Sequence, residues 1–166
     1  MVDLALLHKG FHIVTGPRPR DDNRTVLQEW DSFYKYLVDQ GFSTKPVMGG
    51  AGGAAGEAYA WAIANPDKVS CIYGENPILR SKMSNTQPLD HLAPLAKSGV
   101  RILHVCGSLD PWLESQSRVA QKRYQELGGR ITVMIKEGEG HFPLAPKDQQ
   151  PVVDFIIKSV AAASSK

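Results

Sequence analysis

The chain has 166 residues, 42% of them hydrophobic and 22% charged, which is the composition of one soluble globular domain. Its net charge of +2 is spread along the chain, so no nucleic-acid or polybasic membrane binding is indicated, and no apolar run has the length of a membrane span. No signal peptide follows Met1, and we expect a cytoplasmic protein. Cys71 and Cys106 lie in apolar runs, so we expect two buried thiols rather than a disulfide or a metal pair.

Helical segments recur along the chain. The first is the end of a helix at residues 4–9, with Gly10 as its C-cap. In the second, apolar residues such as Val26, Trp30 and Phe33 recur at spacings of three and four. The predicted helices span residues 4–9, 25–40, 53 or 54–64, 90–97, 113–127 and 152–161.

Five short apolar runs lie between these helices and are typical of buried strands. They span residues 11–14, 46–48, 69–73, 100–106 and 131–135. Strands alternate with helices and no hairpin signal appears. This alternation predicts an α/β fold, a parallel sheet with helices on both faces in three layers.

The connection around which the chain is organised is a turn of small residues. Residues 49–56 are all glycine or alanine, between a short strand and a helix. Such a turn lets backbone N–H groups face a ligand at the helix N-terminus. It matches the dinucleotide-binding pattern G-x-G-x-x-A from Gly50 to Ala55. It also matches the nucleophile elbow G-x-S-x-G, with Gly52 at the serine position.

In a parallel sheet, ligands bind beyond the carboxyl ends of the strands, so the residues that follow each strand are the candidates. Two of these loops have recognisable patterns. They are Gly107-Ser108-Leu109-Asp110 and Gly138-Glu139-Gly140-His141.

The order of glycine elbow, G-x-x-D loop and G-x-G-H loop resembles that of α/β-hydrolases, in particular esterase- and dienelactone-hydrolase-like members. The segment 61–73 is also similar to the helix and strand after the elbow in that family. The resemblance covers residues 4–160. It implies that Asp110 holds His141 in the tautomer that deprotonates a serine.

The chain departs from this family in two ways. Glycine at position 52 cannot attack an acyl carbon, and removing the serine costs subtilisin roughly 10⁶-fold in turnover. The family's first strands are also absent, together with a loop that supplies an oxyanion-hole N–H. We therefore expect residues 1–166 to form one domain equivalent to roughly the C-terminal two-thirds of the family fold, as a fragment of a longer protein or as a variant that closes the gap.

Further polar residues near the same sheet edge are candidates for binding. Glu57 has the alternative role of a first-turn acid that complements the helix dipole. We expect no metal and no cofactor, and a small-molecule ligand as partner. We expect neither nucleic acid nor membrane as partner. We also expect that the fold is completed either by a second copy of the chain, in a homo-oligomer, or by a missing N-terminal segment. The predicted catalytic residues are His141, Asp110 and Glu75, and the predicted substrate-binding residues are Gly52, Gly53, Asn76, Arg80, Glu57 and Arg18.

Three functions stay open. The first is an enzyme without the serine, in which His141 acts as general acid/base on a small polar substrate such as a sugar derivative or an ester. The second is an inactive hydrolase that keeps its ligand pocket. The third is a dinucleotide-binding domain in which Glu75 meets a ribose, although this leaves Asp110 and His141 without a role.

Overall fold

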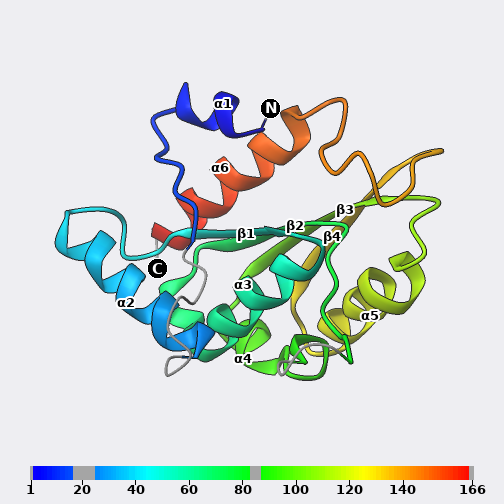
Figure 1. Ribbon diagram of the computed structural model, residues 1–166. Helices are drawn as coiled ribbons and strands as arrows, with labels where there is room; N and C mark the ends of the chain where they lie inside the picture. Colours follow the sequence, from blue (N-terminus) through cyan, green and yellow to red (C-terminus); the bar gives the residue numbers. More distant parts are fainter. Residues whose placement is uncertain (1, 17–24, 83–86, 165–166) are drawn as a thin grey trace.

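The computed structural model describes residues 2–16, 25–82 and 87–164. Four strands form one sheet with helices on both faces (Figure 1). Helices α1 (Val2–Leu7) and α6 (Gln150–Ser164) cover one face. Helices α3 (Gly52–Ala64), α4 (Ala93–Lys97) and α5 (Val119–Glu126) cover the other. The predicted α/β architecture is confirmed.

The sheet is parallel throughout, in the order β1-β2-β3-β4. Its strands are β1 (Val47–Ala51), β2 (Cys71–Glu75), β3 (Arg101–Gly107) and β4 (Arg130–Lys136). Because all four run the same way, the segments after Ala51, Glu75, Gly107 and Lys136 meet at one edge.

Alternation along the strands divides the core into two clusters. On β3, Ile102 packs with Trp61 and Tyr124 toward α3 and α5, whereas Leu103 packs with Ile156 toward α6. Successive strand side chains point to opposite faces, and here both faces are apolar because both are covered by helices.

Local signals explain where the helices begin and end. Helix α2 (Val26–Asp39) begins with a capping box in which the Thr25 hydroxyl accepts from Gln28 N and the Gln28 side chain accepts from Thr25 N. Helix α1 ends two residues earlier than predicted, and Gly10 follows with φ +83°. Phe11 N donates to Leu6 O there, as in a Schellman-type end.

Two predicted helices are shorter or less regular than expected. The segment predicted at 90–97 is a 3₁₀ turn, Pro88–Asp90, followed by α4. The segment predicted at 113–127 begins with a π-helical stretch, Leu113–Arg118, before α5. Single π turns often occur at functional sites, and this one begins three residues after Asp110.

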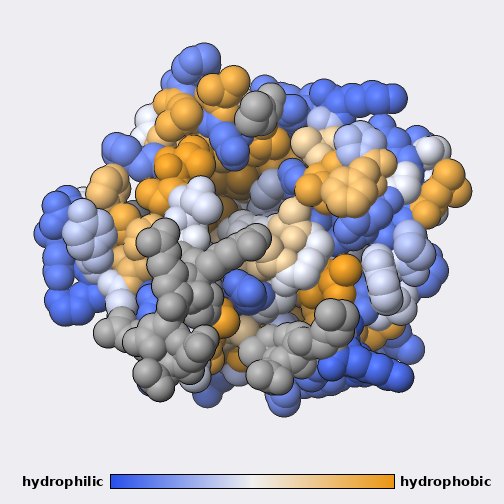
Figure 2. Space-filling model, viewed as in Figure 1, coloured by the Kyte–Doolittle hydropathy of each residue, from blue (hydrophilic) through white to orange (hydrophobic). Residues whose placement is uncertain are grey.

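The strand predicted at residues 11–14 is wrong. Residues 11–16 have no regular structure, and Ile13 and Val14 are 42% and 50% exposed. A strand needs a hydrogen-bonded neighbour, but β1 is an outer strand of the described sheet and residues 11–14 do not pair with it. Leu4 and Leu7 of α1 are also exposed. Figure 2 shows apolar side chains gathered in the region of α1. The expected self-association stays a prediction.

Cys71 and Cys106 are buried free thiols, as expected. Of the helices in the described ranges, none is long and apolar enough to cross a membrane.

Candidate functional site

The turn between β1 and α3 is tight and depends on two of its glycines. Gly52 begins α3 with φ +51°, a left-handed backbone that glycine adopts without strain. At Gly50 an added Cβ would lie 2.6 Å from Ala55 Cα, so only glycine lets the strand approach the helix this closely. The two glycines therefore serve different needs, one of backbone conformation and one of space.

Gly52 faces His141. A Cβ built on Gly52 would lie 3.5 Å from His141 Nε2 and 4.0 Å from its Cε1. A hydroxyl on that carbon would reach hydrogen-bonding distance of Nε2. A side chain at position 52 would therefore point at His141 Nε2, and glycine supplies none.

The other side of the His141 ring contacts an acid. His141 Nδ1 lies 3.2 Å from Asp110 Oδ1, and the Asp110 side chain is only 1% exposed. Trp112 N also donates to Asp110 Oδ1 at 3.0 Å, which fixes the carboxylate. This network assigns the proton to Nδ1, so Nε2 is the acceptor that faces Gly52. Asp110 and His141, the pair predicted from the two loop motifs, are therefore in contact.

Asn76 holds the histidine loop in place. Its Nδ2 donates to His141 O at 2.6 Å, and its Oδ1 accepts from Gly107 N at 2.9 Å. The residue is 1% exposed and has φ +42°, a conformation that asparagine tolerates better than most residues. Asn76 was predicted to bind substrate, but both ends of its amide bond the protein instead. We assign it a positioning role.

Two further residues support this loop and were not predicted as site residues. The buried Lys136 amine donates to the carbonyls of Pro143 and Leu144. At Gly107, an added Cβ would overlap the backbone of Glu139 and Gly140. The signal for Lys136 was its alternation on β4, which places it on the α6 face, where a lysine needs buried acceptors.

Glu75 does not join the histidine. Its carboxylate accepts a hydrogen bond from the Tyr73 hydroxyl, which lies on the same face of β2. Burial, and then the Glu75 hydrogen bond, raise the pKa of Tyr73. In the described structure, no hydrogen bond or ion pair links Glu75 to His141 or Gly52.

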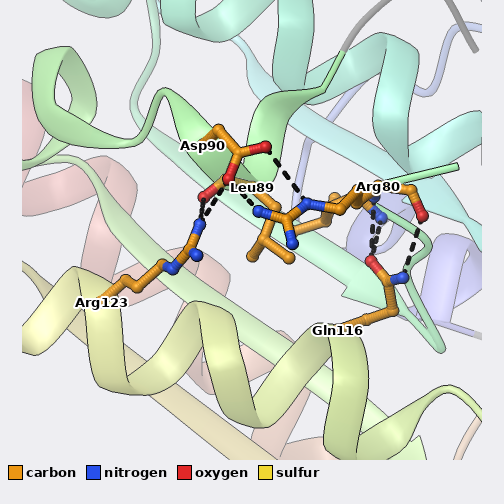
Figure 3. Close-up of polar contacts among 6 residues, drawn as sticks. Arg80, Leu89, Asp90, Gln116 and Arg123 are labelled. Carbon is orange, nitrogen blue, oxygen red and sulfur yellow. Dashed lines mark hydrogen bonds and ion pairs between the residues drawn. The ribbon is translucent and has the colours of Figure 1, made fainter.

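Arg80 is engaged with other side chains of the protein. Its guanidinium pairs with Asp90, which also binds Arg123 Nη1 at 2.6 Å (Figure 3). The Gln116 side chain, at the π-helical segment, bonds both the N–H and the carbonyl of Arg80 at 2.9 Å. The Arg80 hydrogen bond and then that of Arg123 lower the pKa of Asp90. A substrate role for Arg80 gains no support from this arrangement.

The remaining predicted residues have different outcomes. Gly53 is exposed, and nothing lies within 4 Å of an added Cβ. Glu57 lies beyond the first turn because α3 begins at Gly52, so its expected first-turn role is wrong. Arg18 lies outside the described residues. No cluster of three or more potential metal ligands occurs in the described ranges.

A buried polar chain behind the site was not anticipated. His104 is fully buried, with Tyr59 Oη 2.6 Å from its Nε2 and Ser117 Oγ 3.0 Å from its Nδ1. Cys106 Sγ lies 3.1 Å from the same Ser117 hydroxyl. Burial lowers the pKa of His104 to about 3, so the ring is neutral. This chain ties α3 to β3 and to the π-helical segment.

Solved structures resemble this fold at low sequence identity. A puromycin-hydrolyzing peptidase of Mycobacterium tuberculosis superposes with a TM-score of 0.61 and 15% identity over 85% of this chain and 25% of its own. A carboxylesterase of Bacillus cereus superposes with a TM-score of 0.61 and 15% identity, over 80% of this chain and 59% of its own. For a predicted CIB-like hydrolase of Thermoplasma acidophilum the TM-score is 0.54 and the identity 22%, over 90% of this chain and 66% of its own.

These proteins are longer than this chain, which spans between 25% and 66% of their lengths. No protein-family model matches the sequence, and no curated protein matches it significantly. At these identities the likeness shows the fold alone. Together with the parallel sheet, the elbow turn and the acid and histidine loops, it establishes that this chain has an α/β-hydrolase fold.

Proposed function

We propose that this chain is a hydrolase-derived enzyme that cleaves a small ester without a serine nucleophile. The observation that carries the proposal is the distance of 3.5 Å between the Cβ position of Gly52 and His141 Nε2. A paired histidine aimed at a turn without a side chain is suited to activate a water molecule in place of a serine.

The reaction follows from this arrangement. Asp110 orients the imidazole through Nδ1, so Nε2 takes a proton from a water molecule beside Gly52. The water oxygen bonds to the acyl carbon, and the bond from that carbon to the leaving oxygen breaks. The proton on Nε2 is then passed to the leaving oxygen, which gives an acid and an alcohol. No acyl-enzyme forms.

The start of α3 supplies stabilisation for the negative charge that develops on the carbonyl oxygen. The first N–H groups of a helix lack intrahelical partners and lie at the positive end of its dipole. Gly53 is exposed at this position. Its N–H is the donor that this chain offers to the oxyanion.

The side chains beside the pair favour a substrate with an apolar part. Leu109 and Trp112, which flank Asp110, are 69% and 44% exposed, and Phe142 next to His141 is 72% exposed. The expectation of a sugar-like ligand rested on polar residues such as Arg80 and Asn76, which are engaged within the protein. A small ester therefore fits better than a sugar derivative.

The test is hydrolysis of p-nitrophenyl acetate and butyrate by the unmodified protein and by His141→Gln. We expect slow, burst-free turnover that falls by roughly 10²-fold in the variant, as for loss of a general base. His91→Gln is the control, because His91 is exposed and contacts neither Asp110 nor Gly52. Equal rates in all three proteins would refute the enzymatic proposal.

An inactive ligand-binding hydrolase is the second candidate, favoured by the lack of a side chain at Gly52 itself. It predicts no turnover by any of these proteins, together with saturable binding of the ester that His141→Gln weakens. The dinucleotide alternative gains no support, because the glycine turn follows the outer strand β1, and Glu75 already accepts a bond from Tyr73. Dinucleotides bind at a strand-order switch point within a sheet.

A further inference from the structure

A pocket lies at the opposite end of the sheet from the histidine. It has a volume of about 210 Å³ and is lined by residues at the beginnings of the strands and the end of α6. Its cations are Lys45, which precedes β1, and Arg101 and Arg130, which begin β3 and β4. The proposed reaction uses none of them.

The two arginines lie side by side. Arg101 and Arg130 are register partners on neighbouring strands. Like charges placed directly opposite on a sheet destabilise it. In the described structure neither guanidinium has an ion pair or a hydrogen bond to a carboxylate. By contrast, Arg80 and Arg123 share Asp90.

Other groups in the pocket do not neutralise these cations. Among the described residues of the lining, Asp67 is the one with a carboxylate, and it accepts a hydrogen bond from Ser98. The last turn of α6 contributes about half a negative charge, and Lys45 Nζ donates to its Ala163 carbonyl at 3.3 Å. Burial raises the pKa of the Cys71 thiol to about 11, so it is uncharged at neutral pH. The pocket keeps an excess of about 1.5 positive charges.

A buried hydroxyl also lines the pocket. Ser159 of α6 lines the pocket, is 1% exposed, and has no well-formed hydrogen bond to any described residue. Its contact is with the Cys71 thiol, a weak acceptor, and a hydrogen bond from Ser159 lowers the pKa of that thiol against the larger effect of burial. A thiol is a weak acceptor, so the Ser159 hydroxyl can give up this partner for an anion in the pocket that it shares with Arg101 and Arg130.

We propose that this pocket binds a tetrahedral oxyanion, a phosphate group either free or as a small monoester. Arginine forks match phosphate oxygens, and the Ser159 hydroxyl donates to another oxygen. The site lies at the amino ends of the strands. It goes beyond the proposed hydrolase function and does not depend on it.

The test is titration with inorganic phosphate by calorimetry and by amide NMR, with sodium chloride at matched ionic strength as the reference. We expect saturable binding with shifts at Ser98 and Gly99, weakened about tenfold by Arg101→Gln or Arg130→Gln and less by Ser159→Ala. β-Glycerophosphate in a parallel titration separates the sources: tighter binding than phosphate identifies a monoester, and weaker binding identifies free phosphate.

The matched control is Lys9→Gln/Lys122→Gln, which removes two exposed cations away from the pocket. It should bind phosphate as the unmodified protein does. Without phosphate, Arg101→Gln/Arg130→Gln should be at least as thermally stable as the unmodified protein, because it loses a repulsion. The proposal is overturned if chloride produces the same shifts, or if the arginine and lysine double variants bind phosphate equally.

Discussion

The two ends of the sheet treat their polar side chains in opposite ways. At the carboxyl end, Asp110, Asn76 and Lys136 all bond neighbours in the chain, and one atom of that network, His141 Nε2, faces the elbow. At the amino end, Arg101 and Arg130 lie side by side, and no described residue gives either of them a carboxylate partner.

This contrast separates two kinds of site. A histidine that must act on one point in space needs a support that fixes its loop, and that support consumes the surrounding polar groups. A site for a small anion needs cations that are still available. Substitutions at the carboxyl end should therefore lower stability, whereas those of the amino-end arginines should not.

The largest loss of stability is expected at Gly107. An alanine there would overlap the backbone of the histidine loop, so Gly107→Ala should lower the free energy of unfolding by about 3 kcal/mol or more. Gly53→Ala, where the added methyl meets nothing within 4 Å, is the control. Urea denaturation of both variants measures the difference, and equal stability would mean that this loop is not packed as described.

The second largest loss of stability is expected for substitutions of Asn76. Asn76→Gly keeps the freedom to adopt φ +42° but loses both hydrogen bonds, so we expect a loss of about 2–3 kcal/mol. Asn76→Ala should lose somewhat more, since alanine adds backbone strain. In the ester assay, Asn76→Gly should lower kcat more than it raises KM. A variant with unchanged stability and kcat would remove the positioning role.

His104 should make the stability of the folded protein depend on pH. Its pKa is about 3 in the folded protein and about 6.5 unfolded, so the unfolded state binds more protons below pH 6.5. The stability that comes from keeping His104 neutral is fully present above pH 6.5 and is lost as the pH falls toward 3. Between pH 7 and 5 it amounts to about 2 kcal/mol. The stability of His104→Gln should fall correspondingly less over that range, with His91→Gln as control; parallel pH profiles for His104→Gln and the unmodified protein would contradict this account.

The smallest effect on stability is expected for Gly52→Ala. Its methyl would make an ordinary contact with His141 Nε2 at 3.5 Å, so the cost is backbone strain of about 1 kcal/mol. The same methyl would take the place of the attacking water and lower ester turnover. Turnover that survives the substitution would show that the water does not act there.

The sequence predicted those parts of the fold that depend on local patterns. The four strands of the sheet follow from short apolar runs, and the Asp110 and His141 loops follow from motifs in family order. Residues 11–14 have an equally apolar run but do not form a strand, because a strand also needs a neighbour that no local pattern reveals.

The supports of the site depend on which distant segments meet. The amide of Asn76 bridges β3 and a loop 65 residues away, and the amine of Lys136 reaches backbone carbonyls, which have no sequence signature. The pairing of Arg101 with Arg130 likewise depends on strand register. Residue types alone therefore indicated ligand binding for Asn76, where the structure shows support of the loop.

The most direct test of the central claim is to place the absent hydroxyl at the elbow. Folded Gly52→Ser should be labelled by a fluorophosphonate probe and show a burst with p-nitrophenyl butyrate, because its hydroxyl would lie within reach of His141 Nε2. The unmodified protein and Gly52→Ser/His141→Gln should remain unlabelled. Labelling of the unmodified protein, or a folded Gly52→Ser variant that does not react, would contradict the assignment of Gly52 and His141 as the two sides of a hydrolase site.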